Sequence, residues 1–154
     1  MNVFTSRFGD IEINKEEIIV FPNGVLGFEE MKKYIILKMD EDNPLMWLQS
    51  LEEPALAFVI INPYEFRDEY EVELNEDDVK LLKIDKPEDV KLYSIVVVPH
   101  GEPAKMTANL QGPVVINSLT RLGKQVVLKN SKYSVKHYIL EEMKEKAKKA
   151  QGGK

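Results

Sequence analysis

The chain has 154 residues, no cysteine and a formal net charge of −5 at pH 7. The length fits one domain with its own core, the lack of cysteine excludes disulfides, thiolate metal sites and thiol nucleophiles, and the acidic balance disfavours binding to a nucleic-acid backbone. Because the sequence contains neither an apolar run of the ~18 residues that span a membrane nor an apolar signal core near its start, we expect a cytoplasmic protein.

Short apolar or alternating runs predict strands in the first half of the chain. These runs are residues 11–13, 18–21, 34–39 and 56–61. Asn23 and Gly24 follow the second run and predict a turn. Residues 28–33 can form one or two helical turns, and the polar residues 40–44 predict another turn.

The middle of the chain combines one alternating run with one helix. Residues 70–74 alternate apolar and acidic positions, which predicts a strand with its glutamates outward. Asn75 then has the features of a helix N-cap, because the acidic residues 76–78 follow it, and negative charge suits the first turn of a helix. We expect a short helix there, followed by the longest strand over residues 90–98.

Residues 106–117 read MTANLQGPVVIN, with small or polar residues between two short apolar runs. This pattern predicts a strand, a tight turn and a second strand. Asn109 and Gly112 tolerate left-handed backbone angles, and Pro113 ends the turn.

The C-terminal part continues the strand pattern and then changes. Strands are expected over residues 123–129 and 133–140. Residues 141–154 have helical spacing but almost no apolar face, so we expect a frayed helix or a disordered tail, loose over residues 151–154.

Many short strands with turns between them, and no βαβ alternation, predict an all-β fold that is mainly antiparallel. We expect a compact β-barrel-like domain over residues 1–140, with one short inserted helix, and a flexible or helical tail over residues 141–154. Periodicity does not separate a barrel from a sandwich. The positions expected in the core are Ile11, Ile13, Phe21, Phe58, Val96, Val98, Ile116 and Val126.

The sequence contains few patterns typical of a catalytic or metal-binding site. The two histidines, His100 and His137, have no second histidine at ligand spacing, and no serine lies in a G-x-S-x-G setting. We therefore expect no catalytic residue, no metal site and no cofactor. Carboxylates are so plentiful that a β-barrel hydrolase with a carboxylate pair stays open as an alternative, as does an OB-like nucleic-acid binder.

Acidic residues concentrate in one segment. Residues 65–89 contain 11 acidic and 4 basic side chains, whereas residues 141–154 contain 3 acidic and 5 basic ones. Such a segment can serve solubility alone or can form a docking face for a basic partner. The candidate partner-binding residues on this face are Asp68, Glu69, Glu71 and Glu73. If the acidic face binds no partner, the partner interface is expected to involve a second set of residues: Asn62, Pro63, Tyr64, Met106, Thr107, Ala108 and Asn109.

Five short motifs follow one another along the chain. They are FPNGVLGF at residues 21–28, WLQS at 47–50, FVIINP at 58–63, MTANLQGPVVIN at 106–117 and GKQ at 123–125. Together they resemble the flagellar assembly factor family of the FliW type, and the resemblance covers about residues 2–140. It implies a compact, β-rich, barrel-like protein of the cytoplasm that is not an enzyme.

The resemblance also implies two alternative protein partners. One is the carbon storage regulator, a small RNA-binding dimer that represses flagellin translation, and the other is flagellin before export. Members of the family remove the regulator from its messenger and bind flagellin in a chaperone-like way. The chain would then be an anti-repressor in flagellum biogenesis, without a small-molecule substrate, a membrane partner or direct contact with nucleic acid.

Overall fold

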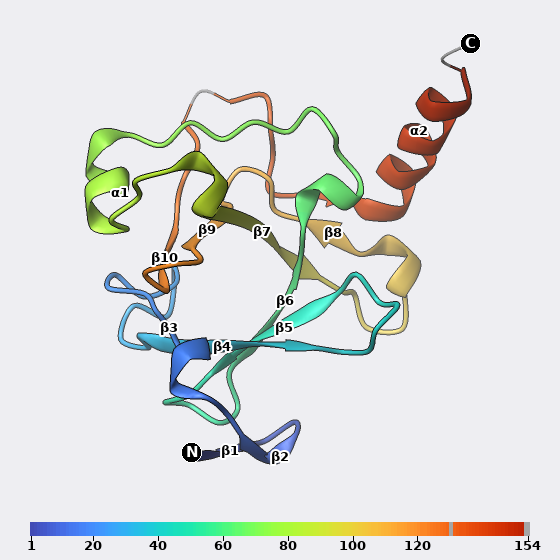
Figure 1. Cartoon of the computed structure of the whole chain (residues 1–154). Helices are drawn as coiled ribbons and strands as arrows, with labels where there is room; N and C mark the ends of the chain where they lie inside the picture. The colour runs from blue at the N-terminus through green and yellow to red at the C-terminus, as the bar shows by residue number, and fades with distance from the viewer. Residues whose placement is uncertain (130, 153–154) are drawn as a thin grey trace.

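The computed structural model describes residues 1–129 and 131–152, and its centre is a closed ring of strands (Figure 1). The ring consists of β3 (Ile19–Val20), β4 (Lys33–Lys38), β5 (Met46–Ser50), β6 (Ala57–Ile61), β7 (Val90–Val97), β9 (Val114–Asn117) and β10 (Leu122–Gln125). The hydrogen-bonded order is β7, β6, β5, β4, β3, β10 and β9, and the pairing of β9 with β7 closes the barrel. Only β3 and β10 pair in parallel among these described strands. The expected mainly antiparallel, barrel-like fold is therefore confirmed.

Shorter elements decorate the barrel. β1 (Asn2–Thr5) and β2 (Gly9–Glu12) form a separate hairpin, and β8 (Thr107–Ala108) lies between β7 and β11 (His137–Tyr138). The helices are α1 (Glu76–Leu81) and α2 (Ile139–Gly152), and the 3-10 turns are η1 (Lys15–Glu17), η2 (Pro63–Glu65), η3 (Pro87–Asp89) and η4 (Pro103–Lys105). α2 projects from the barrel at the end away from the β1–β2 hairpin (Figure 1). Within residues 1–129 and 131–152, neither helix has the length and apolar composition needed to cross a membrane.

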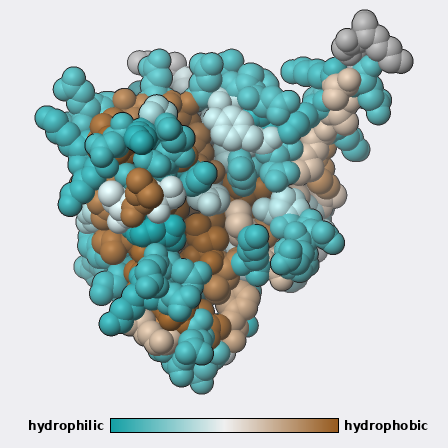
Figure 2. Space-filling view, in the orientation of Figure 1, coloured by the Kyte–Doolittle hydropathy of each residue, from teal (hydrophilic) through white to brown (hydrophobic). Residues whose placement is uncertain are grey.

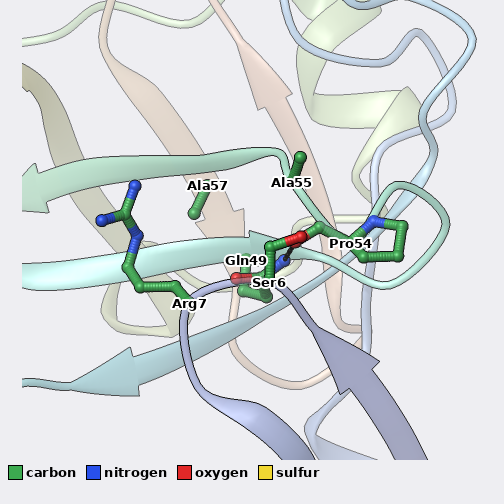
Figure 3. A pocket seen from close by; sticks show the side chains of 6 residues that line it. All are labelled: Ser6, Arg7, Gln49, Pro54, Ala55 and Ala57. Atoms are coloured by element: carbon green, nitrogen blue, oxygen red, sulfur yellow. Dashed lines mark hydrogen bonds between the residues drawn. The ribbon is translucent and has the colours of Figure 1, made fainter.

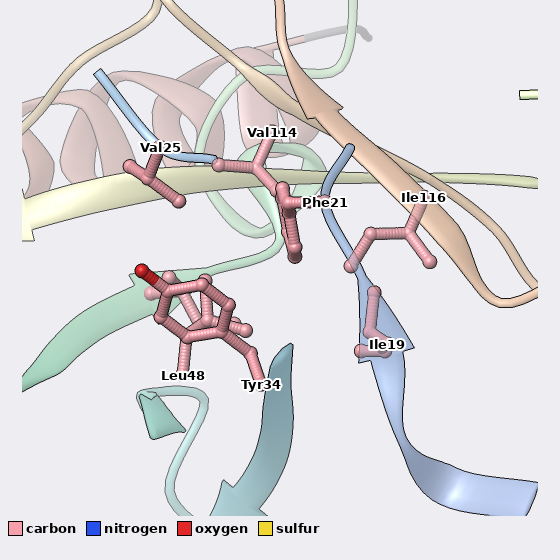
Figure 4. Close-up of a cluster of buried hydrophobic side chains, with 8 residues drawn as sticks. Ile19, Phe21, Val25, Tyr34, Leu48, Val114 and Ile116 are labelled. Atoms are coloured by element: carbon pink, nitrogen blue, oxygen red, sulfur yellow. The ribbon is translucent and has the colours of Figure 1, made fainter. Parts of the chain in front are cut away.

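The barrel core forms around Phe21, whose ring meets that of Tyr34 edge to face at 5.2 Å between centroids. Both side chains are fully buried, as are those of Ile19 and Leu48 beside them (Figure 4). Gly123 of β10 packs directly on this ring, because a Cβ there would come within 2.8 Å of Phe21 Cζ. Figure 2, in the orientation of Figure 1, shows hydrophobic residues in the middle of this face with hydrophilic residues around them.

A second set of apolar side chains covers the outside of the barrel. Alternation along β6 puts Ile60 in the barrel core and Ile61 on the opposite face of the strand. The buried residues around Ile61, which we call the outer cluster, are Phe66, Tyr70, Val96, Ala108, Leu110, Tyr133 and Ile139. A third cluster of Leu82, Val115 and Val126 packs where α1 ends. The acidic segment, α1 and α2 are thus all held on the barrel by apolar contacts.

Most of the expected core positions are buried. The prediction is confirmed for Ile13, Phe21, Val96, Ile116 and Val126. Ile11 and Phe58 are only half-buried. Val98 was assigned wrongly, since its side chain is 43% exposed: β7 ends at Val97, and the chain leaves the sheet there.

Two of the expected local elements do not form. Residues 28–33 contain no helical turn, because Gly24 and Gly27 adopt positive φ angles of 67° and 89° and a bridge joins Val25 to Phe28, so the chain makes tight turns instead. Residues 70–74 are not a strand, since no described strand pairs with them, although their burial alternates as expected.

The 106–117 segment does not fold back on itself as predicted. β8 and β9 both pair with β7, so they run along the same neighbouring strand, and residues 109–113 bulge out between them. The Asn109 side-chain oxygen accepts hydrogen bonds from the backbone N–H groups of Gln111 and Gly112 at 3.0 and 2.8 Å. Neither Asn109 nor Gly112 has a positive φ. The side-chain hydrogen bonds, and not left-handed angles, shape this bulge.

The two C-terminal strands are shorter than predicted. β10 ends at Gln125, and β11 is only 2 residues long because the chain turns into α2 at the buried Ile139. The tail is therefore helical over most of its length. The expectation that residues 151–154 are loose is wrong for Gln151 and Gly152, which belong to α2, and residues 153–154 lie outside the described residues. Independent folding of residues 1–140 remains a prediction.

Candidate functional site

The acidic segment between η2 and α1 is anchored by Tyr70. Its side chain is 2% exposed, its hydroxyl donates a 2.7 Å hydrogen bond to the Leu110 carbonyl oxygen, and its ring lies 4.8 Å from that of Tyr133. Burial raises the pKa of the Tyr70 hydroxyl well above its ordinary value, so the group stays a neutral donor. With Tyr70 fixed inward, Glu71 and Glu73 face solvent.

Asp68 and Glu69 already have cationic partners within the chain. Lys146 Nζ of α2 lies 3.0 Å from Asp68 Oδ1, and Arg67 Nε lies 3.1 Å from Glu69 Oε1. In the part of the chain that the structure describes, Glu71 and Glu73 make no ion pair. Of the four acidic candidates, these two carboxylates are therefore the ones that remain available to an external cation.

A groove of about 670 Å³ runs beside these carboxylates, and we call it the acidic groove. One wall carries Glu69, Glu71, Glu73 and Asn75, and the other carries Val126, Val127, Leu128, Lys129, Ser131, Lys132 and Tyr133. In Figure 1 the two walls are the green segment before α1 and the orange segment after β10. At one end, Asp78 is 2% exposed and paired with Lys124, while its backbone N–H bonds to the Asn75 side chain. Asp78 thus fixes α1 to β10 and does not face a ligand as a free charge.

Asn62, Pro63 and Tyr64 lie next to the acidic segment. The Asn62 side chain accepts a 2.9 Å hydrogen bond from Tyr64 N–H and so begins η2, while Pro63 is buried. The Tyr64 hydroxyl donates to the Tyr70 carbonyl oxygen at 2.9 Å. Lys146 Nζ donates to the Tyr64 carbonyl oxygen at 2.7 Å, so α2 contacts both this turn and Asp68.

The remaining candidates, Met106 to Asn109, lie beneath the acidic segment and not on its exposed face. Thr107 and Ala108 are 7% and 0% exposed and are paired on both sides, with β7 and with β11. Ala108 belongs to the outer cluster beneath the acidic segment. Thr107 and Ala108 therefore form the interior strand of a small sheet, so their backbone groups are not open to a partner.

Sequence reasoning missed the charged network that joins α2 to the barrel. Glu142 accepts from Arg67 Nη1 at 3.3 Å and lies 2.7 Å from His137 Nδ1, while His137 Nε2 accepts the Ser134 N–H at 2.9 Å. Arg67 and Glu142 are 75 positions apart, so no local pattern could pair them. His137 is thus held within a structural network.

A smaller pocket of about 190 Å³ lies under the β1–β2 hairpin (Figure 3). The fully buried Gln49 forms part of it and donates through Nε2 to the carbonyl oxygens of Ser50, Pro54 and Leu56. Arg7 at its rim stacks on Trp47, with Cζ 4.3 Å from the ring centroid. These contacts tie the hairpin to β5 and offer no reactive group. Among residues 1–129 and 131–152, no group of three or more histidine, aspartate or glutamate residues could hold a metal ion.

Comparison with known proteins gives a consistent result. The chain matches the family described as FliW protein over residues 2–139. It is 46% identical over 140 residues to a flagellar assembly factor FliW of Syntrophus aciditrophicus, covering 91% of this chain and 88% of that protein. A flagellar assembly factor FliW of Alkaliphilus metalliredigens is also 46% identical over 140 residues, with 90% and 86% covered. A crystal structure of the flagellar assembly factor FliW superposes with a TM-score of 0.84 at 40% identity, over 90% of this chain and 96% of that one.

Proposed function

The chain belongs to the FliW family of flagellar assembly factors, and from this premise we propose that it is a cytoplasmic binding protein with two alternative partners. One partner is the carbon storage regulator dimer, and the other is flagellin before export. Binding the regulator withdraws it from the flagellin messenger and so relieves repression. Flagellin that accumulates competes for the same protein, which restores repression.

The observation that carries the proposal is the pair of exposed, unpaired carboxylates of Glu71 and Glu73 on the described surface. A protein that binds RNA presents a basic surface to the phosphate backbone. Opposite potentials on two partners raise the rate of encounter and fix their relative orientation. The acidic segment has a charge that suits a basic regulator, and family membership is the reason that we propose the carbon storage regulator in this role.

The proposed action is that of an anti-repressor and not of an enzyme. An acidic protein competes poorly for RNA itself, so it must act on the regulator by direct contact. The same contact can be reversed by flagellin without any chemical step. This reading needs neither a cofactor nor a small-molecule substrate.

An RNA-release assay tests the function. A fluorescent flagellin leader RNA is bound to the purified regulator, and the chain is then added while RNA anisotropy is followed. The proposal predicts release of the RNA on addition of the chain and recapture of the RNA when flagellin is added afterwards. Unchanged anisotropy would contradict the proposal, and a rise in anisotropy with the chain alone would favour a nucleic-acid binder.

A further inference from the structure

The acidic groove is bordered on one side by the free backbone edge of residues 126–128, which follow the end of β10. Val126 and Leu128 donate their N–H groups to the carbonyl oxygens of Pro113 and Gln111 at 2.9 and 2.8 Å, which continues the pairing of β10 with β9. Backbone groups of an extended chain alternate in direction, so those of Val127 point to the opposite edge. The Val127 N–H has no hydrogen-bond partner among the described residues. Residues 126–128 therefore present an unused backbone edge to the groove.

The opposite wall is also extended and also lacks backbone partners. The Glu71 N–H reaches the Tyr133 hydroxyl at 3.3 Å. The N–H groups of residues 72–74 make no hydrogen bond with any residue that the structure describes. Backbone groups that pair with neither protein nor ligand must be satisfied by water. The backbone groups on both walls of the acidic groove can therefore form hydrogen bonds with an extended segment of another protein in place of water.

The size and charge of the groove indicate what it can accept. Its volume of about 670 Å³ lies within the ~300–1,000 Å³ that binding clefts usually offer. Glu71 and Glu73 are two positions apart on the same exposed face, and residues two apart in a strand share a face with the same spacing. A neighbouring strand with lysine or arginine at alternate positions would therefore place a cation beside each carboxylate.

We propose that the acidic groove takes an extended segment of a partner protein, which adds as a strand to the 126–128 edge and sets basic side chains beside Glu71 and Glu73. This mode of binding gives affinity through backbone hydrogen bonds and selectivity through alternate side chains. It deepens the proposed function, since it rests on the chain having a basic protein partner and states how part of that partner is held. Lys129 and Lys132 lie on the other wall. Because they would repel further basic side chains, the remaining residues of the bound partner segment are expected to be neutral.

The probe for this proposal is a fluorescent peptide, TVKVKVT, whose binding is followed by anisotropy. The proposal predicts saturable binding by the full chain. Two further peptides carry N-methyl groups on alternate backbone nitrogens, one in each register, because N-methylation removes donors and leaves charge unchanged. At least one of them must bind about tenfold more weakly, the loss expected for one or two net hydrogen bonds. No binding of the parent peptide, or equal binding of all three, overturns the proposal.

Variants of the chain test the two walls separately. Glu71→Gln with Glu73→Gln should weaken TVKVKVT roughly three- to tenfold, as for a pair of exposed ion pairs, and should leave the neutral peptide TVTVTVT unaffected. The matched control is Asp10→Asn with Glu12→Gln, two exposed acids on the β1–β2 hairpin. Val127→Pro removes the free donor and should weaken every peptide, whereas Val127→Thr keeps the donor and should not. If Val127→Pro fails to fold, the N-methylated peptides still test whether backbone hydrogen bonds hold the peptide in the groove.

The outcome is separable from that of the proposed function. RNA release from the regulator is measured on the same variants as peptide binding. Normal release together with absent peptide binding would overturn the groove and leave the anti-repressor function in place. Peptide binding without RNA release would uphold the groove and count against the regulator as partner.

Discussion

Lys146 of α2 lies with its Nζ 3.0 Å from Asp68 Oδ1 and donates at 2.7 Å to the Tyr64 carbonyl oxygen. A cation from the C-terminal helix thus already occupies one end of the acidic segment. Of the four acidic candidates, Glu71 and Glu73 are therefore the two without an ion pair in the described chain, and α2 borders this segment.

Removing the Lys146 charge should cost little stability and should enlarge the acidic face. For Lys146→Met we expect a loss below about 1 kcal/mol in urea unfolding, since the pair is exposed, and faster association with the basic regulator. Lys148→Met is the matched control, because Lys148 Nζ only approaches Glu145 of the same helix at 3.8 Å. Equal acceleration by both variants would mean that net charge alone matters.

The two halves of α2 should differ in their effect on stability. Residues 147–151 are exposed, so deleting residues 147–154 should leave the melting temperature unchanged. Deleting residues 141–154 also removes Met143, which packs on the outer cluster, and Glu142, which pairs with Arg67. That loss should be about 1–3 kcal/mol, measured by thermal and urea unfolding. Identical melts for both truncations would show that α2 contributes nothing to the barrel.

Phe21 should matter more to the core than Phe58. Phe21→Ala should cost about 3–5 kcal/mol, because the side chain is fully buried, whereas the half-buried Phe58 should cost less when truncated. Val98→Ala should be nearly neutral, since the side chain is 43% exposed. Chemical unfolding of the three variants provides the ranking, and a Phe58 loss equal to that of Phe21 would contradict it.

Alkaline pH should unfold the protein partly through Tyr34. Burial, with a smaller effect of Glu52, raises the pKa of Tyr34 from 10.0 to about 12. The folded state then favours the neutral hydroxyl more than the unfolded state does, so this stability is complete below pH 10 and is lost as the pH rises through 12. The loss is about 1–3 kcal/mol at ~1.4 kcal/mol per pKa unit.

Tyr34→Phe isolates that contribution. The Tyr34 hydroxyl is buried without a hydrogen-bond partner among the described residues, so the substitution should be neutral or slightly stabilising at pH 7. Between pH 10 and 12 the variant should lose less stability than the unchanged chain. Parallel pH curves for the two proteins would remove Tyr34 from this account.

Local signals in the sequence predicted local structure well. Asn75 and the acids that follow it predict α1, and the Asn75 side chain does accept the Asp78 N–H at 2.7 Å. The 70–74 alternation correctly separates the exposed glutamates from the buried Tyr70 and the half-buried Val72 and Leu74, but a strand also needs a neighbouring backbone, and none is present in the described chain. Alternating apolar and polar residues indicate which side chains are buried, but they do not indicate whether the backbone pairs with another strand.

Local sequence patterns could not predict contacts between residues that are far apart in the chain. Barrel closure depends on β9 pairing with β7, and the predicted strand, turn and strand of residues 106–117 do not identify this partner. Glu69 is paired with its near neighbour Arg67, but the cation beside Asp68 comes from Lys146 of α2, which is 82 positions from the Tyr64 carbonyl it also contacts. Composition therefore identified the acidic candidates. It could not show which of their carboxylates remain without an ion pair.

The association rate with the regulator tests the central claim most directly. Stopped-flow mixing at low salt compares the unchanged chain, the variant Glu71→Gln with Glu73→Gln, and the control Asp10→Asn with Glu12→Gln. We predict that only the first variant associates more slowly, roughly tenfold at most, and that the difference shrinks at high salt, where the Debye length falls well below ~8 Å. Flagellin binding, expected to be more apolar, should change less. Equal association rates for the two variants at low salt would contradict the claim that this face attracts the regulator.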